Sequence, residues 1–154
     1  MDVTIRQAKH DDVEALTMLA MASKQSNGYD DAFMAACADE LRVTSASLDA
    51  HEYWVADSGT PCGFISLEVD PDGLTGMIGS FFIAPGWQRR GIGRLLWSTV
   101  EEFARKKGLK VLRLDADPEA EAFYRGLGFS TVNRVPSGSI PGRTLPHMQI
   151  DLSA

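Results

Sequence analysis

A short basic turn in the middle of the chain combines residue types that can hold a phosphate group. The turn consists of Gln88, Arg89, Arg90, Gly91, Ile92, Gly93 and Arg94. An apolar run at residues 77–83 precedes it, and apolar residues three and four apart follow it over residues 95–104, which predicts strand, turn and helix. The first turn of a helix leaves N–H groups unpaired at the positive end of its dipole, so an anion binds there readily.

The glycines and arginines of this turn suit a bulky anion. Gly91 and Gly93 lack a Cβ atom, so a phosphate can approach the backbone closely. Arg89, Arg90 and Arg94 add positive charge and forked hydrogen-bond donors. We therefore predict phosphate or pyrophosphate binding here, and the alternative is an ordinary surface turn with solvated arginines.

Two motifs together resemble one protein family. The turn is neither a dinucleotide fingerprint, which needs glycine where Leu96 stands, nor a P-loop, which needs Gly-Lys-Ser/Thr. Its pattern Gln-x-x-Gly-x-Gly, after a strand that ends in Ile-x-Pro, resembles the acetyl-CoA pyrophosphate loop of the GCN5-related N-acetyltransferases, the GNAT superfamily. Residues 122–129, with their Phe-Tyr and Gly-Phe pairs, resemble the family's second motif.

The resemblance implies a mixed α/β fold with one GNAT-like domain over residues 1–154. Such a fold has a central, mostly antiparallel sheet of about six to seven strands, with a parallel pair splayed at the cofactor site and about four flanking helices. The sequence pattern predicts strands near residues 3–6, 53–56, 62–69, 77–83, 111–114, 129–132 and 148–152. It predicts helices that begin near residues 11, 31, 92 and 118, and loops at residues 45–49 and 137–146.

The connections between these segments predict the topology of the sheet. Short turns join the three strands between residues 53 and 83, which favours an antiparallel meander. The order strand, long helix, strand over residues 77–114 favours a right-handed crossover and a parallel pair.

The same resemblance implies an enzyme that transfers the acetyl group of acetyl-CoA, its co-substrate, to a primary amine of a small molecule or peptide. Tyr124 matches the family tyrosine that protonates the departing thiolate, and a phenol can exchange a proton with a thiolate of similar basicity. Direct attack by the amine is expected, because neither motif contains a cysteine that could form an acyl-enzyme.

Further cofactor-binding residues follow from the resemblance. The backbone of Phe81, Phe82 and Ile83 is expected to pair with the pantetheine arm, and one N–H there to polarise the thioester carbonyl. Asp117 stands where the family often has an asparagine that contacts the cofactor, and a carboxylate accepts hydrogen bonds but donates none. Asp117 also suits a helix cap, so both roles stay open.

The acceptor side carries weaker signals. Glu68 is a candidate general base acting through water, or a solvated strand carboxylate. Tyr29 and Asp30 lie in a helix–helix loop that commonly borders the acceptor pocket. Arg143 lies in the segment Ser137–His147, which resembles a loop of a bacterial GNAT subgroup of unassigned substrate. Arg143 is expected either to bind an acceptor carboxylate or to fasten this loop.

Composition narrows the remaining function classes. The chain has 154 residues and a net charge of −6, which argues against general nucleic-acid binding. No apolar run approaches the roughly 20 residues of a membrane helix, and the first residues lack a signal-peptide pattern, so we expect a cytoplasmic protein. Cys37 and Cys62 fit no metal site, and we expect no metal. Relatives are often dimers, so a homodimer is one expected arrangement.

Two other functions compete with acetyl transfer. An acyl-CoA sensor or interaction module would keep the cofactor site and lack turnover, and the absence of an acid on strand 77–83 favours it. A nucleotide phosphate binder would use the basic turn alone. Thiol release from acetyl-CoA with a panel of amines separates the enzyme from the sensor, and protection by ATP would indicate the nucleotide binder.

Overall fold

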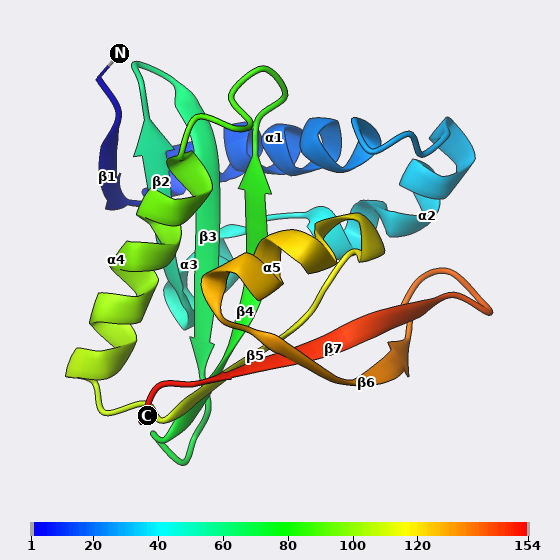
Figure 1. Ribbon diagram of the computed structural model, residues 1–154. Coiled ribbons are helices and arrows are strands. Elements are labelled where there is room, and N and C mark those ends of the chain that lie inside the picture. Colours follow the sequence, from blue (N-terminus) through cyan, green and yellow to red (C-terminus); the bar gives the residue numbers. More distant parts are fainter. Residues whose placement is uncertain (1, 154) are drawn as a thin grey trace.

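The computed structural model describes residues 2–153, which form one seven-stranded sheet with helices on both faces (Figure 1). The strands are β1 (Thr4–Gln7), β2 (Glu52–Asp57), β3 (Pro61–Val69), β4 (Thr75–Ile83), β5 (Val111–Asp115), β6 (Ser130–Pro136) and β7 (Thr144–Asp151). The helices are α1 (Val13–Gln25), α2 (Asp31–Leu41), α3 (Ser45–Ala50), α4 (Ile92–Lys106) and α5 (Glu121–Leu127), with the 3-10 turns η1 (His10–Asp12) and η2 (Pro118–Ala120). No helix within residues 2–153 has the length and apolar content that crossing a bilayer requires.

The sheet has the order β1-β2-β3-β4-β5-β7-β6, and its one parallel pair is β4 with β5. The mixed fold, the antiparallel meander and the parallel pair are therefore confirmed. The parallel pairing lasts for three residue pairs, Thr75–Met77 against Val111–Arg113. Beyond Met77 strand β4 continues to Ile83 without β5 at its side. This divergence leaves one edge of β4 unpaired in the middle of the sheet.

Alternating side chains of the central strands bury two separate apolar clusters, one on each face of the sheet. Ile65 and Leu67 of β3 pack with Leu96 of α4. Phe64, which points the other way, packs with Leu16 of α1. Because successive strand residues face opposite sides, α4 and α5 cover one face, and α1 and α2 cover the other. Figure 1 shows both layers around the sheet.

Two segments differ from the sequence prediction. Residues 45–49, predicted as a loop, belong to α3, because the Thr44 hydroxyl accepts from Ser47 N–H and the Ser47 hydroxyl accepts from Thr44 N–H, both at 3.0 Å. This reciprocal capping starts a helix with serine where glutamate or glutamine is the usual signal. Strand β7 begins at Thr144, so the loop predicted to reach Pro146 ends earlier.

Candidate active site

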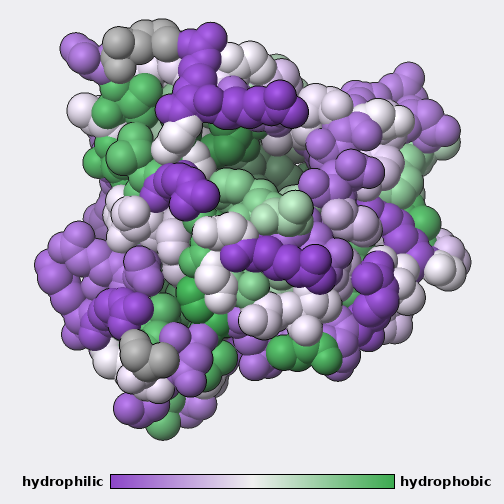
Figure 2. Space-filling view, in the orientation of Figure 1, coloured by the Kyte–Doolittle hydropathy of each residue, from purple (hydrophilic) through white to green (hydrophobic). Residues whose placement is uncertain are grey.

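A cleft of about 790 Å³ lies where β4 and β5 diverge. It is lined by β4 beyond Met77, the end of β5, the first turn of α4, part of α5, the end of α1 and the loop between β6 and β7. Figure 2 shows a hollow with apolar residues inside and hydrophilic residues along its border. The cleft therefore connects both helical layers through the sheet.

The basic turn forms one end of this cleft. Gly91 is the N-cap of α4 with φ of 82°, and Arg89 has φ of 64°, a left-handed conformation that costs a non-glycine residue about 1–2 kcal/mol. Gly91, Gly93, Arg89 and Arg94 line the cleft, as do Gln88 and Ile92. Strained backbone beside a helix N-terminus is typical of an anion-binding turn.

Arg90 differs from its neighbours in the turn. Its guanidinium lies over the Trp87 ring at 5.1 Å from the centroid, and it is not among the residues that line the cleft. The turn predicted from sequence thus divides into residues that face the cleft and an arginine that packs on an aromatic ring.

Strand β4 forms the floor of the cleft and carries a bulge. Ser66 Oγ accepts a hydrogen bond from the Ser80 N–H at 2.8 Å, where the β3–β4 register shifts. Past the bulge, Phe81, Phe82 and Ile83 pair with β3 on one side and line the cleft on the other. Their backbone groups on that second side have no strand partner, so an extended ligand could pair with them as an added strand.

Tyr124 of α5 enters the cleft from the face covered by α4. Its ring is 8% exposed and lies edge-on to Phe81, Phe123 and Phe129 at centroid distances of 5.5–5.9 Å. Burial, and then the negative charge of Asp117, raise the pKa of its phenol. No hydrogen bond to this hydroxyl is recorded within residues 2–153. The hydroxyl is therefore protonated and able to donate into the cleft.

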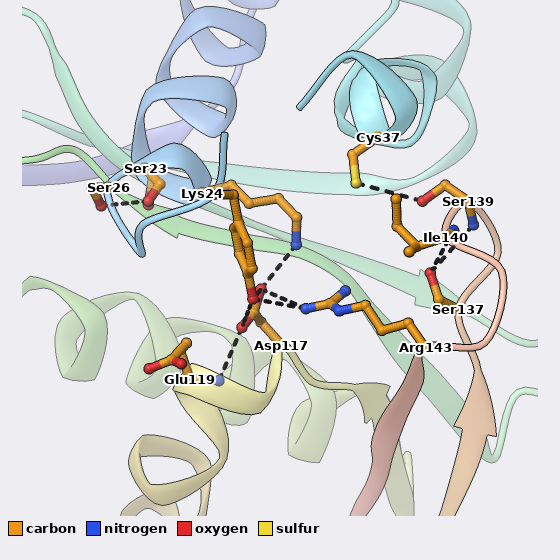
Figure 3. A network of polar contacts seen from close by, with 11 residues as sticks. Ser23, Lys24, Ser26, Cys37, Asp117, Glu119, Ser137, Ser139, Ile140 and Arg143 are labelled. Carbon is orange, nitrogen blue, oxygen red and sulfur yellow. Dashed lines mark hydrogen bonds and ion pairs between the residues drawn. The ribbon is translucent and has the colours of Figure 1, made fainter. Parts of the chain in front are cut away.

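Asp117 gathers polar groups from the distant segment at residues 24–29 and from its own turn η2 (Figure 3). Its carboxylate accepts from Lys24 Nζ of α1 at 2.9 Å, from the Tyr29 hydroxyl at 3.0 Å and from the Glu119 N–H at 2.9 Å. Burial alone would raise the pKa of Asp117, but these hydrogen bonds and the Lys24 charge outweigh it and lower the pKa. Asp117 therefore both caps η2 and holds α1 against the start of α5.

Arg143 joins the β6–β7 loop to this cluster. Its Nη2 donates to the Tyr29 hydroxyl at 2.8 Å and lies 3.5 Å from Asp117 Oδ2, and its guanidinium stacks over Tyr29 and Phe33. The same loop contacts α2 through Ser139, whose hydroxyl is 3.5 Å from Cys37 Sγ. Lys24, Asp117 and Arg143 line the cleft, whereas Tyr29 stands behind them.

Three residues predicted for the acceptor side, Tyr29, Asp30 and Glu68, lie outside the cleft lining. Asp30 caps α2 by accepting from the Phe33 N–H at 2.8 Å. The Glu68 carboxylate is 40% exposed, 3.9 Å from His51 Nε2, and lies beside Gly79 of β4. The structure thus brings most predicted residues together in the cleft lining and leaves four outside it: Tyr29, Asp30, Glu68 and Arg90.

The cleft also contains side chains that sequence reasoning missed. No local sequence pattern indicates that Lys24 belongs to the site, because its partner Asp117 is 93 residues away in the chain. Asp115 closes β5 and lines the cleft, and its Oδ1 is 2.7 Å from His147 Nδ1 of β7. The sequence shows Asp115 at a strand end and His147 in a loop-like segment. Only the β5–β7 register places them opposite each other.

Comparisons with known proteins agree with this architecture. The model of the Acetyltransferase (GNAT) family matches residues 13–129. The aminoglycoside N(6')-acetyltransferase type 1 of Stenotrophomonas maltophilia is 29% identical over 107 residues. That match covers 67% of this chain, and the chain spans 61% of the length of this curated relative.

Solved structures share the fold at lower identity. The PaiA N-acetyltransferase of Thermoplasma acidophilum, solved in complex with coenzyme A, superposes with a TM-score of 0.78 at 21% identity, over 98% of this chain and 99% of that one. A Salmonella typhimurium protein solved with its cofactor acetyl-CoA has a TM-score of 0.70 at 23% identity, over 99% of this chain and 95% of that one. At these identities the likeness shows the fold.

Proposed function

Because the chain belongs to the acetyltransferase (GNAT) family, we propose that it transfers the acetyl group of acetyl-CoA to a primary amine of a small molecule or peptide. Residues 1–154 act as one N-acetyltransferase domain on this proposal. One observation carries it: a single cleft connects a strained helix N-terminus, an unpaired strand edge and a buried tyrosine. These are the parts needed to hold a pyrophosphate, hold an extended thioester arm and protonate a thiolate.

The cofactor half of the cleft fits acetyl-CoA. The first-turn N–H groups of α4, with Arg89 and Arg94, would hold the pyrophosphate, and the edge of β4 at residues 81–83 would pair with the pantetheine arm. The acetyl-CoA thioester supplies the activated acetyl group. Relatives of the same fold solved with coenzyme A and with acetyl-CoA support this assignment.

Tyr124 is the proposed acid for the departing thiolate. Its raised pKa makes the phenol a weaker acid than in water. The same low-polarity surroundings raise the basicity of a thiolate formed beside it, because desolvation penalises both anions. Transfer of the phenol proton from Tyr124 to the coenzyme A thiolate therefore stays favourable. The negative charge of Asp117 helps to keep the phenol protonated until the carbon–sulfur bond breaks.

Direct attack in a ternary complex is the proposed route. Cys37 and Cys62 are both 1% exposed, neither lines the cleft, and burial raises the pKa of the Cys62 thiol. A buried thiol that resists ionisation is a poor nucleophile. The amine would therefore enter from the side of Lys24 and Arg143 and attack the thioester carbonyl itself.

Thiol release from acetyl-CoA tests the proposal. The panel includes kanamycin, because a curated relative is named as an aminoglycoside acetyltransferase, together with spermidine, free amino acids and peptides with a free N-terminus. Release of one thiol per N-acetylated product, identified by mass spectrometry, is the expected result. Tight coenzyme A binding without release by any amine would instead favour the acyl-CoA sensor. Equal thermal protection by ATP and coenzyme A would favour the nucleotide phosphate binder.

A further inference from the structure

A carboxylate–imidazole pair lies at the cleft, where Asp115 belongs to the lining and His147 stands next to it. Asp115 is the last residue of β5, and His147 is its direct partner on β7, with Nδ1 2.7 Å from Asp115 Oδ1. Leu114 and Met148, their chain neighbours, belong to the core under α4 and α5. Because strand side chains alternate, Asp115 and His147 project from the opposite face, the one covered by α1 and α2.

This position lies across the cleft from the proposed acid. The parallel pairing of β4 and β5 ends at Arg113, and Asp115 lies two residues further along, where the gap has opened. Tyr124 enters the same gap from α5 on the other face. Acetyl transfer needs an acid beside the sulfur and a proton acceptor beside the amine, and opposite walls of one cleft supply those two places.

We propose that the Asp115–His147 pair accepts the proton of the substrate ammonium. This inference rests on the proposed function. The ammonium gives one proton to the pair, the neutral amine forms the carbon–nitrogen bond, and the carbon–sulfur bond breaks. As the tetrahedral intermediate collapses, its nitrogen loses a second proton and Tyr124 gives its own proton to the leaving thiolate. The second nitrogen proton then restores the Tyr124 phenol through solvent. The pair releases its proton to water, so each turnover yields one amide, one thiol and one proton.

The surroundings of the pair favour Asp115 over Glu68 for this task. Asp115 lines the cleft, and its second oxygen is outside the His147 contact. Glu68 does not line the cleft. The other charged groups near Asp115 have partners of their own. Arg113 forms an ion pair with Asp70 at 2.5 Å and interacts electrostatically with Glu68 and Asp115. Asp117 is held by Lys24.

His147 positions the Asp115 carboxylate, and its two ring nitrogens have different neighbours. Nδ1 faces the Asp115 carboxylate and donates to it, and Nε2 lies 3.4 Å from the Gln149 amide nitrogen. The imidazole therefore fixes the orientation of the carboxylate, and Asp115 accepts the proton at its second oxygen. His147 is a positioning residue in this scheme, and Asp115 touches the substrate.

Comparing a protonated amine with a neutral amine as substrates tests whether Asp115 acts as a base or only supports the structure. An alkylamine found active in the panel is protonated at pH 7, whereas O-methylhydroxylamine is neutral and needs no base. Asp115→Asn should reduce kcat/KM for the alkylamine by about 10²–10⁴-fold at pH 7, with recovery as the pH rises. The same variant should use O-methylhydroxylamine at nearly the wild-type rate, which also demonstrates an intact site.

Control variants test whether Asp115 and His147, and no other carboxylate, are responsible for proton acceptance. Asp151→Asn makes the same change at a β7 carboxylate that contacts Ser153 far from the cleft, and its kcat/KM should stay unchanged. His147→Gln keeps a donor to Asp115, so it should retain more of the alkylamine rate than His147→Ala, which removes that donor. Equal losses with both amines in Asp115→Asn, or a larger loss in Glu68→Gln, would overturn the inference. Absence of thiol release by the wild-type protein with every amine would instead overturn the proposed function, and the base with it.

Discussion

The two halves of the cleft are built in different ways. The half that we propose for the cofactor comes from one continuous segment, residues 81–94, and it offers mainly backbone groups of β4 and the first turn of α4. The acceptor half is made of side chains that meet across the fold: Lys24 meets Asp117 over 93 residues of chain, and Tyr29 meets Arg143 over 114. A backbone site tolerates changes in most side chains, whereas a side-chain cluster depends on each member. The acceptor half is thus the part that a single side-chain substitution should disturb most.

Tyr124 lies between the two halves, and its removal should have the largest effect. Tyr124→Phe deletes one hydroxyl and almost no packing area, so kcat should fall by about 10²–10⁴-fold while coenzyme A affinity stays constant. Tyr53→Phe is the matched control: that buried tyrosine donates to Ser47 Oγ at 3.2 Å, away from the cleft. Stopped-flow thiol release measures the chemical step. Near-normal kcat in Tyr124→Phe would mean that water or another residue protonates the thiolate.

A substitution at Gly91 tests whether backbone groups of the basic turn bind coenzyme A. Gly91→Leu forces a side chain into a left-handed position at the helix N-terminus, so it should abolish the stabilisation by coenzyme A. That stabilisation is about 2.7 kcal/mol at 100 times Kd. Gly59→Leu is the matched control, because Gly59 has φ of 109° in the β2–β3 turn and meets the same strain without a ligand nearby. Thermal shifts of both variants, with and without coenzyme A, measure the difference. Equal shifts would contradict a phosphate site at this turn.

The contrast between the halves also explains what the sequence could predict. The basic turn, the strand before it and the helix after it are local in sequence, and their element types are confirmed. The parallel pair followed from one connection and is confirmed too. Lys24 and the Asp115–His147 pair could not be found, because they depend on which strands become neighbours and in which register. Helix α3 was missed because its capping uses serine, a weak local signal.

A substitution at Asp117 tests whether its negative charge holds the acceptor cluster of Lys24, Asp117 and Arg143 together. Asp117→Asn keeps the shape but removes the negative charge that Lys24 and Arg143 share, so the free energy of unfolding at pH 7 should fall by about 2 kcal/mol. The folded-state pKa of Asp117 is lowered, so this stabilisation is present above the unfolded carboxyl value and is lost as the pH falls through the folded one. Urea unfolding at pH 7 and near pH 3 should therefore show a difference between wild type and variant that shrinks in acid. A change in coenzyme A affinity would reassign Asp117 to the cofactor half.

Arg143 tests whether the acceptor cluster holds the loop or holds the substrate. Its guanidinium already donates to Tyr29, approaches Asp117 and stacks on Tyr29 and Phe33. Arg143→Lys keeps the charge but loses the planar stack and the fork, so we expect a loss of stability of about 1 kcal/mol. If the loop is what Arg143 secures, the KM of every amine should rise by a similar factor, with or without a carboxylate.

A substrate role would give a different pattern in the same variant. A charged hydrogen bond is worth about 1.5–3 kcal/mol, so a guanidinium that binds an acceptor carboxylate would cost carboxylated amines about tenfold or more in KM. Plain amines and acetyl-CoA would keep their KM. Arg134→Lys is the matched control, because Arg134 donates to Thr144 on the β6–β7 hairpin and does not line the cleft. The melting temperature and the Michaelis constants for one carboxylated and one plain amine therefore decide between the two roles. Because Nη2 of Arg143 already donates to the Tyr29 hydroxyl, we expect the KM of both amines to rise by the same factor.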